Sequence, residues 1–358
     1  MGPGFSVAAA KTVSVLDVNS RANLVRVCII GTGTVGRWLL RALRRDEGEL
    51  AARYGVDLRL VAVGGRDGLV HDPAGIDIEE LLALRASGGS LASLGAHSPT
   101  ALEGISQIDA DVLAEVSQSL PPYGEPGLSH IRAALERGIA VATSNKWPMA
   151  LAGVALVERA RANGVGLRAE STVMSGTPVL AALTDGLCGA TPLRLRGVVN
   201  ATVNFICSRM EQGASYPQGL AEAQAAGLAE RDPTADVDGL DSVAKLMVLS
   251  ALVFGEQLEL RHVARHGLSE LVASGLEPGA RIREVATLDP AAGHRSVAAT
   301  TLAEDDPLGA ITGVTNCIRL QAEPLGEVSI TGPGAGPGLA GQGVFSDMIT
   351  LAQQRVSR

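Results

Sequence analysis

The sequence predicts an α/β protein in which a doubly wound parallel sheet is followed by a second domain of the α+β class. A strand-like run at 25–30 is followed at once by a glycine-rich turn, a helical pattern that begins near Trp38, and a second apolar strand at 58–63. The chain has 358 residues, which is long for one domain and suits two. After a predicted helix at 151–163 the pattern changes, so we expect the second domain to begin near residue 149.

Composition and charge exclude several classes of protein. The formal net charge is −8 and no basic patch stands out, so we expect no nucleic-acid partner. No run of about 18 apolar residues occurs, so we expect no membrane span. The four cysteines (Cys28, Cys188, Cys207 and Cys317) lie far apart and form no CxxC pair, which is typical of buried apolar side chains in a reducing compartment. We therefore expect a cytoplasmic protein.

The remaining elements follow from hydrophobic periodicity and turn residues. Helices are predicted at 78–86, 127–137, 151–163, 178–186, 221–226, 243–253 and 343–354, and strands at 111–116, 139–143, 166–173, 193–200 and 327–331. His262 and His266 are four residues apart without a third ligand, so we interpret them as surface helix residues and not as a metal site.

A glycine motif, Gly31-x-Gly33-x-x-Gly36, separates the first strand from the first helix. This spacing lets the backbone approach a pyrophosphate, which binds N–H groups at the helix N-terminus, where Thr34 and Val35 lie. The motif alone also fits a tight turn, but its place between strand and helix favours a Rossmann-type dinucleotide-binding domain. We expect this domain at 24–148, an N-terminal extension, ordered or disordered, at 1–23, a substrate domain at 149–315, and a C-terminal segment at 316–358 that returns to the first domain.

The end of the second strand bears on the choice of dinucleotide. An acid at this position holds the ribose 2′-hydroxyl of NAD in many such domains. Here the strand ends in two glycines followed by Arg66, which suits the 2′-phosphate of NADP. We therefore favour NADP. The neighbouring Asp67 keeps NAD open, and a solvated loop arginine would give the same pattern.

Five acidic residues occur within positions 230–241, directly ahead of an apolar run. Asp238 is expected to cap the next helix, on which Asp241 and Lys245 lie four residues apart on one face. Such a pair can orient a polar substrate and relay a proton. On spacing alone, a surface ion pair fits somewhat better than a catalytic centre.

Lys146 follows the strand at 139–143, at the edge where open α/β sheets bind their ligands. A lysine here can meet a carboxylate or a reacting carbonyl oxygen, although a surface lysine gives the same pattern. A lysine that is partly desolvated in a cleft is expected to have its pKa lowered toward the working pH, which suits acid–base catalysis.

From about residue 24 to 355 the sequence resembles the homoserine dehydrogenases. The motifs that carry the resemblance, besides the glycine turn, occur in order at 124–126 (Gly-Glu-Pro), 143–146 (Thr-Ser-Asn-Lys), 170–173 with Pro178, 197–204, 232–245 and 332–336 (Gly-Pro-Gly-Ala-Gly). The resemblance implies NAD(P)-dependent interconversion of L-homoserine and L-aspartate 4-semialdehyde by direct hydride transfer, in the biosynthesis of threonine, methionine and isoleucine.

The resemblance also implies roles for individual residues. The cofactor would contact Gly31, Gly33, Thr34, Val35, Gly36, Arg66, Ser117, Lys146 and Gly336. The substrate would contact Glu230, Asp236, Asp241 and Asn200. Lys245 would donate or accept the proton, fixed by Asp241, while Lys146 would lie between nicotinamide and substrate. Glu170, with the backbone carbonyls of Val173, Ser175 and Thr177, would form a sodium site.

Three positions depart from the family pattern: Met174 in the cation loop, Ala201 beside the substrate loop, and Trp147, a bulky residue that could narrow the cleft. They leave open a sibling oxidoreductase acting on another small amino or hydroxy acid. A non-catalytic nucleotide-binding regulator is a weaker alternative, since the catalytic positions are intact. The resemblance implies a homodimer or homotetramer with its interface in the substrate domain. The resemblance is to the short form of the family, so we expect no C-terminal regulatory domain.

Overall fold

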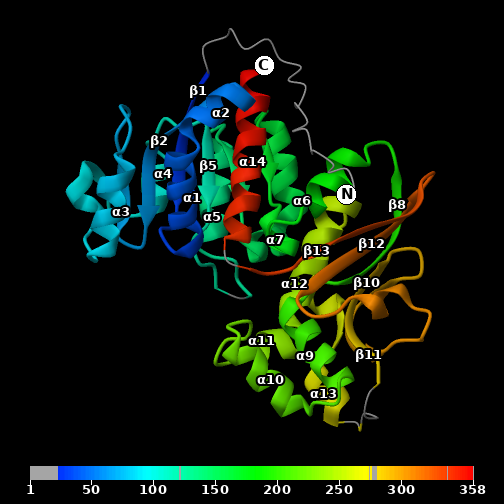
Figure 1. The fold of residues 1–358 in the computed structure, drawn as a ribbon. Coiled ribbons are helices and arrows are strands. Elements are labelled where there is room, and N and C mark those ends of the chain that lie inside the picture. Colours follow the sequence, from blue (N-terminus) through cyan, green and yellow to red (C-terminus); the bar gives the residue numbers. More distant parts are fainter. Residues whose placement is uncertain (1–22, 121, 274, 276–279, 337, 358) are drawn as a thin grey trace, which may run out of the picture.

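A computed structural model describes residues 23–120, 122–273, 275, 280–336 and 338–357 (Figure 1). The expected extension at 1–23 lies outside these residues, except for Asn23. Within the described residues the strands form one seven-stranded and one six-stranded sheet. None of the described helices is long and apolar enough to cross a membrane.

The first sheet has the strand order β4-β3-β2-β1-β5-β6-β7. Its strands are β1 (Asn23–Ile30), β2 (Val56–Gly65), β3 (Gly68–His71), β4 (Ala96–Ser98), β5 (Val112–Glu115), β6 (Ala140–Thr143) and β7 (Leu167–Arg168). From β2 to β7 the pairing is parallel, as predicted, whereas β3 and β4 add two antiparallel strands at one edge. The chain moves from one side of β1 to the other after β4, so the switch point lies at the carboxyl end of β1.

Helices cover both faces of this sheet, as in a doubly wound fold. One face carries α1 (Thr34–Arg45), α2 (Glu47–Tyr54), α3 (Ile78–Ala86) and α14 (Leu339–Val356), and the other carries α4 (Ala101–Ile105), α5 (Gly127–Glu136) and α6 (Lys146–Ala162). The alternation along β1 explains the two layers: Val27 and Ile29 enter the first core, while Cys28 and Ile30 enter the second.

The second sheet has the order β13-β12-β8-β10-β11-β9. Its strands are β8 (Thr191–Val198), β9 (Ala264–His266), β10 (Ile282–Asp289), β11 (His294–Thr301), β12 (Thr315–Glu323) and β13 (Gly326–Pro333). Its helices are α9 (Ala201–Glu211), α10 (Tyr216–Ala225), α11 (Thr234–Val237), α12 (Leu240–Leu249) and α13 (Leu268–Ala273). The first sheet continues past residue 148, where a boundary was expected, because β7 adds to it. Of the C-terminal segment, β12 and β13 pair in the second sheet and α14 returns to the first.

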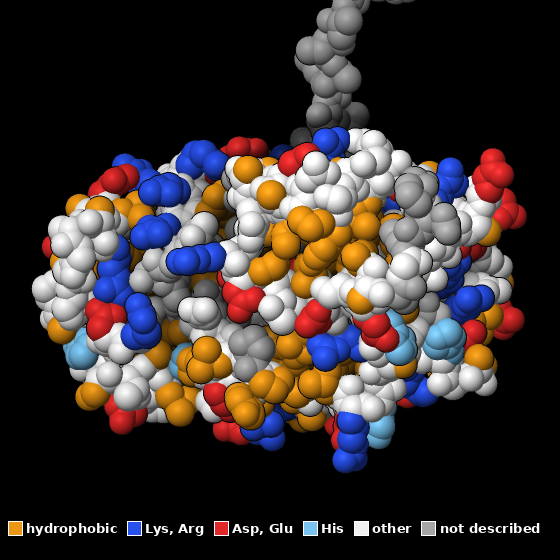
Figure 2. Space-filling view, turned by 90° about the horizontal axis from the view of Figure 1, so that it is seen from below, with side chains coloured by type: hydrophobic (Ala, Val, Ile, Leu, Met, Phe, Trp, Pro, Cys, Tyr) orange, Lys and Arg blue, Asp and Glu red, His pale blue; other side chains and the backbone are white. Residues whose placement is uncertain are grey.

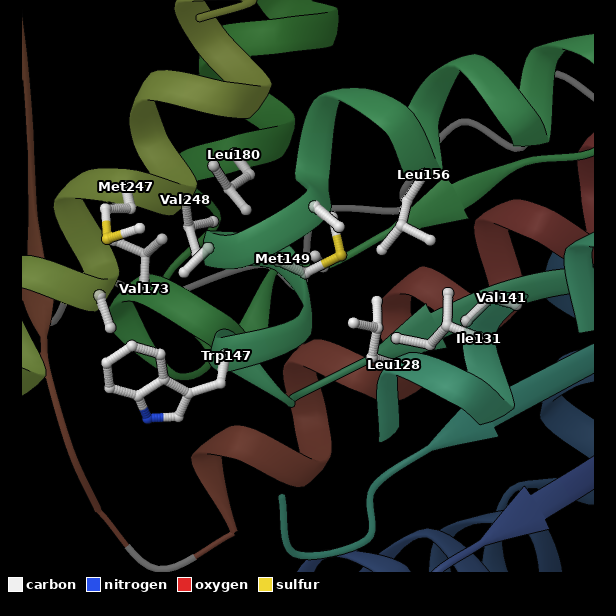
Figure 3. Packing of buried hydrophobic residues seen from close by; sticks show 14 of the residues in the cluster. Leu128, Ile131, Val141, Trp147, Met149, Leu156, Val173, Leu180, Met247 and Val248 are labelled. Carbon is white, nitrogen blue, oxygen red and sulfur yellow. The ribbon is translucent and has the colours of Figure 1, made fainter. Parts of the chain in front are cut away.

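Helix α12 joins the two halves of the molecule. Every residue from Ser242 to Leu249 is buried, because the helix packs on α6 on one side and on the second sheet on the other. Figure 3 shows the side chains of this junction, where Trp147 lies close to Val173 and Met247. Trp147 is only 6% exposed, so it belongs to the core and does not narrow the cleft as expected.

Several predicted elements differ from those observed. The strand expected at 166–173 ends at Arg168, and Ser171–Met174 forms the short helix α7, because Asp347 of α14 accepts a hydrogen bond from the Glu170 backbone N–H at 2.8 Å. His262 and His266 are exposed as expected, but they lie in a 3-10 turn and in β9 and not in a helix.

One predicted helix, one unpredicted strand and one cysteine also differ from what the sequence indicated. The short helix α8 (Val179–Ala181) and a following π turn at 182–186 replace the regular helix expected at 178–186. Strand β10 was not predicted because both of its faces are buried, which removes the alternating pattern. The described cysteines are free, and three are buried as expected, but Cys188 is exposed.

Candidate active site

The glycine turn lies at the carboxyl edge of the first sheet, and its three glycines have different surroundings. Gly31 has φ +113°, and a Cβ there would lie 2.6 Å from the Val116 carbonyl. A Cβ on Gly36 would lie 1.8 Å from the Gly31 oxygen, so only glycine lets α1 pack this close to the turn. A Cβ on Gly33 would meet nothing within 4 Å. That open space is where the backbone can approach a phosphate.

The first turn of α1 is suited to an anion. Its N-cap, Gly33, supplies no side-chain acceptor, and the turn that contains Thr34 and Val35 carries no acidic residue. Figure 2 looks at the molecule from below, toward this edge, and shows Lys and Arg side chains grouped on its left side, where the first domain lies. The residues present therefore fit a dinucleotide phosphate.

The end of β2 places Arg66 and Asp67 in different environments. Arg66 is exposed. Asp67 is bound by both terminal nitrogens of Arg85, at 2.8 and 2.9 Å, and these hydrogen bonds lower its pKa to about 2. Arg85 also donates to the Thr32 hydroxyl at 3.1 Å, within the glycine turn. Asp67, the acidic residue that kept NAD possible as the cofactor, is thus already paired with Arg85.

Asp241, in the first turn of α12, binds two lysines. One carboxylate oxygen accepts a hydrogen bond from Nζ of Lys146, the first residue of α6, and the other lies 2.9 Å from Nζ of Lys245. Lys245 also donates to the Val199 carbonyl at 2.7 Å. The side chains of Lys245 and Asp241 are only 11% and 16% exposed, so the pair is not a surface ion pair. Lys146 is 31% exposed, so its side chain is more open to solvent than those of Asp241 and Lys245.

Asn200 connects this centre to a second acid. Its side-chain oxygen accepts from the Val203 N–H at 3.0 Å and so caps α9, while its amide nitrogen donates to Asp236 at 2.9 Å and to Asp241 at 3.4 Å. The N-cap hydrogen bond fixes which way the amide points. Two acidic and two basic side chains therefore face one another with defined orientations.

The pKa values of this cluster depend on burial and on mutual charge. Burial acts to raise the pKa of Asp241, but the charges of Lys146 and Lys245 outweigh it and hold that pKa well below its usual range. Burial raises the pKa of Asp236. Burial acts to lower the pKa of Lys146, but the Asp241 carboxylate raises it more. The expectation of a lowered pKa is therefore wrong for Lys146.

The sequence did not indicate the residues behind this centre. Gly239, in the left-handed conformation with φ 78°, is the N-cap of α12, while the expected cap, Asp238, ends α11. Beneath this turn lies Glu284 of β10, which is fully buried and accepts a hydrogen bond from the Ser242 hydroxyl. Burial raises the pKa of Glu284 to about 8, and its second oxygen has no partner among the described residues.

Three predicted site residues make no described contact with the centre around Asp241. Glu230 is exposed in the loop between α10 and α11, and the described contacts do not join its side chain to Asp236 or Asp241. Ser117 donates a hydrogen bond to Glu115 at the end of β5. Gly336 is exposed just ahead of α14, where a Cβ would approach the side chain of Leu339.

The loop around α7 is held by hydrogen bonds. The two carboxylate oxygens of Glu170 accept from the backbone N–H groups of Leu180 and Ala181 at 2.8 and 2.7 Å, and burial raises its pKa. The hydroxyls of Ser175 and Thr177 donate at 3.0 Å to carbonyls of the C-terminal glycine-proline segment. The part of the chain described holds no cluster of three His, Cys, Asp or Glu side chains suited to a metal ion, so a cation here would need backbone oxygens.

Known proteins resemble the chain along most of its length. Residues 31–170 match the family model for the NAD binding domain of homoserine dehydrogenase, and residues 178–349 match the model for homoserine dehydrogenase. The NAD(+)-dependent homoserine dehydrogenase of Pseudomonas canavaninivorans is 35% identical over 338 residues, which are 92% of this chain and 96% of that relative. The chain belongs to the homoserine dehydrogenase family.

Further relatives agree. The homoserine dehydrogenase of Pyrococcus horikoshii is 32% identical over 91% of this chain and 96% of its own length. A hyperthermophilic archaeal homoserine dehydrogenase in complex with NADPH superimposes with a TM-score of 0.78 at 30% identity, covering 92% of this chain and 98% of that one. The chain is thus an NAD(P)-dependent oxidoreductase, which confirms the predicted fold class and enzyme class.

The raised pKa of the buried Glu284 side chain can be tested by measuring how the stability of the protein depends on pH. The folded protein holds a proton on this side chain up to about pH 8, whereas the unfolded chain releases it near the ordinary value of 4.5. The folded state is therefore increasingly disfavoured as pH rises between these values. We expect Glu284→Gln, which keeps the Ser242 hydrogen bond, to gain stability relative to the native protein from pH 5.5 to 8, by up to roughly 1 kcal/mol per pH unit.

Urea denaturation at pH 5.5 and pH 8 measures this difference. Glu158→Gln, at an exposed position on α6, is the matched control and should leave the stability nearly unchanged at both pH values. An equal effect of Glu284→Gln at the two pH values would contradict the assignment.

Proposed function

We propose that this chain interconverts L-homoserine and L-aspartate 4-semialdehyde, in the biosynthesis of threonine, methionine and isoleucine. The observation that carries the proposal is the bridge from Asp241 to Lys146 and Lys245, at the sheet edge that also carries the glycine turn. When bound, the nicotinamide cofactor supplies or accepts the hydride, and the residues of the chain bind, orient and move the proton.

Lys245 is the proposed proton donor and acceptor. An ammonium group has three N–H donors, and those of Lys245 already serve Asp241 and the Val199 carbonyl. In the reduction direction the remaining N–H can give its proton to the substrate oxygen as hydride arrives at the carbon, and in the oxidation direction the neutral amine accepts the hydroxyl proton as hydride leaves. The two fixed contacts orient Nζ before the substrate binds.

Lys146 has a different role in this proposal. Its raised pKa keeps it charged, so it stabilises the developing oxyanion and does not transfer a proton. Asp236, Asp241 and Asn200 would hold the polar ends of homoserine, and the carboxylates suit its ammonium group. Glu230 joins them only if its loop moves toward the centre, because its side chain is exposed.

Replacing Lys245 by alanine tests this assignment. We expect Lys245→Ala to lower kcat for homoserine oxidation by about 100-fold to 10,000-fold, because the proton acceptor is lost. Binding of NADPH, measured by its fluorescence, should stay within about twofold, since this proposal assigns Lys245 to the substrate and not to the cofactor. Arg161→Ala, at an exposed position of α6, controls for loss of a surface charge. Near-normal turnover of Lys245→Ala would overturn the proposal.

We infer a preference for NADP over NAD. The support is the exposed guanidinium of Arg66 at the end of β2, together with the pairing of Asp67 with Arg85. Arginine binds phosphate with charge-assisted hydrogen bonds, whereas a free carboxylate is needed to hold the two ribose hydroxyls of NAD.

This inference predicts a selective effect at Arg66. Loss of one charge-assisted contact of about 1.5–3 kcal/mol should raise KM for NADP by about 10-fold to 100-fold in Arg66→Ala. KM for NAD should change by less than about threefold, because NAD has no 2′-phosphate. Steady-state kinetics with both cofactors measures the effect, and Arg53→Ala on the exposed face of α2 is the control. An equal change for both cofactors would contradict the preference.

We propose a sodium site formed by Glu170 and the carbonyls of Val173, Ser175 and Thr177. The support is a buried carboxylate beside a tight loop in which Ser175 has φ 52°, since hard cations prefer oxygen ligands. The ion would hold the loop of α7 in place, and no step of the reaction passes through it.

Replacing sodium by choline in the buffer should lower the melting temperature by a few degrees, because a bound ion stabilises the folded state. Adding sodium back should restore it, and Glu170→Ala should remove the dependence on sodium. A melting temperature that does not respond to sodium at constant ionic strength would overturn the site.

We also infer that copies of the chain associate through the second domain as a homodimer or homotetramer and act in the cytoplasm on a small-molecule substrate. A groove of about 300 Å³ beside β8 and β12 supports the association. It is lined mainly by apolar side chains, among them Leu183, Leu187, Leu252, Val253 and Leu320. Such surfaces are typically covered by a partner.

A further inference from the structure

Glu115 is a fully buried carboxylate at the carboxyl end of β5. It lies in the middle of the first sheet, paired with Ile30 of β1 on one side and Thr143 of β6 on the other. A buried carboxylate is costly unless hydrogen-bond donors surround it. Because Glu115 lies at the ligand-binding edge of the sheet, its hydrogen-bond donors show which parts of that edge it holds in place.

Three segments donate to this side chain. Its Oε1 accepts from the Ser117 hydroxyl at 2.5 Å and lies 3.3 Å from Nδ1 of His130 on α5, while its Oε2 accepts from the amide nitrogen of Asn145. No lysine or arginine contacts the carboxylate within the described part of the chain. The two oxygens thus serve separate partners: Oε1 holds the β5–α5 loop and Oε2 holds the start of α6.

The surrounding backbone is shaped to keep this arrangement. A Cβ on Gly127 would lie 2.5 Å from Ser119 Oγ and 3.1 Å from both Glu115 Oε2 and the Asn145 amide nitrogen, so a larger residue here would crowd their contact. The Thr143 hydroxyl donates to the Glu115 carbonyl at 2.8 Å and accepts from the Asn145 N–H at 3.0 Å. The β6–α6 junction is therefore tied to Glu115 twice.

Asn145 shows what the contact does. It is the N-cap of α6, where an asparagine side chain ordinarily bonds to the first turn of its helix, but it makes no such bond here. Its amide is directed to Glu115 instead. The next residue is Lys146, whose ammonium reaches Asp241. The orientation of the first residue of α6 thus depends on a carboxylate in the neighbouring strand.

We propose that Glu115 is a positioning residue that sets Lys146 and the Ser117 loop relative to each other. Through Asn145 it fixes the backbone from which Lys146 extends, and through Ser117 it fixes the loop expected to contact the cofactor. Its side chain is fully buried, so it acts through these neighbours. This inference rests on the proposed function, because it assigns Glu115 to the same site.

The test first changes Asn145 alone and then exchanges the hydrogen-bonding groups of Asn145 and Glu115. Asn145→Asp places a second carboxylate against Glu115 Oε2, and like charges at this distance repel. An aspartate is as good an N-cap as an asparagine, so a residue that serves only to cap α6 would tolerate the change. If Glu115 positions Lys146, kcat should fall by about 10-fold to 100-fold, as for small misplacements of catalytic groups. KM for homoserine should change by less than about threefold, because Asp236 and Asn200 are untouched.

The double variant Glu115→Gln with Asn145→Asp supplies the rescue. The new amide at position 115 donates to the new carboxylate at position 145, while its oxygen still accepts from Ser117. The net charge equals that of the native protein, so kcat should return to within about fivefold of the native value, since the contact is restored with its direction reversed. A double variant as impaired as Asn145→Asp, or full activity of Asn145→Asp, would overturn the proposal.

Asp111→Asn is the matched control for strand stability. Asp111 precedes the same strand at its opposite end and is also buried, where it binds Arg26. It should lower the melting temperature without the selective loss of kcat. If Asp111→Asn reproduces the loss of kcat seen in Asn145→Asp, the effect is one of stability and the proposal fails. Lys245→Ala, measured in parallel, reports on the proposed function separately, because it leaves Glu115 and its partners intact.

Discussion

The contact on which the rest of this structure depends is the carboxylate of Asp241 between two ammonium groups. Lys146 comes from the first half of the molecule, whereas Asp241 and Lys245 come from α12, between the two sheets. Without the carboxylate, two positive charges would face each other in a largely buried place, which is strongly unfavourable. The ion pair between Lys146 and Asp241 therefore links the two halves of the molecule at the point where the reaction is proposed to occur.

In the same centre, two chemically similar side chains have different proposed roles. Lys146 is partly exposed and held charged by Asp241, whereas Lys245 is buried and fixed by two acceptors. Position in the fold, and not residue type, distinguishes them. The pairing of Asp67 with Arg85 follows the same logic at the dinucleotide end, where a neighbouring guanidinium satisfies a carboxylate that would otherwise be free to bind a ribose.

What the sequence could predict follows from the range of the interactions. The glycine turn and the first strands depend on neighbours in sequence, so periodicity and spacing were enough to predict them. Spacing also placed Asp241 and Lys245 on one helix face, but it favoured a surface ion pair, and only the family resemblance made them a catalytic centre. Lys146 joins Asp241 across 95 positions, and only the family resemblance brought the two together. Glu284 lies on β10, a strand buried on both faces, where no alternation marks it. The strand expected at 166–173 was wrong because Asp347, on a distant helix, ends it at the backbone of Glu170.

The return of α14 to the first sheet has a consequence for how the chain is made. Val344, Phe345 and Met348 complete the core on the face that also holds α1, where Phe345 packs edge-on against Trp38. A ribosome therefore releases the first 160 residues long before the helix that seals them exists. During that interval an apolar face of the nascent domain stays uncovered, and such surfaces are prone to aggregation. The order of synthesis thus makes the nucleotide-binding half, although it is first to emerge, the last to be finished.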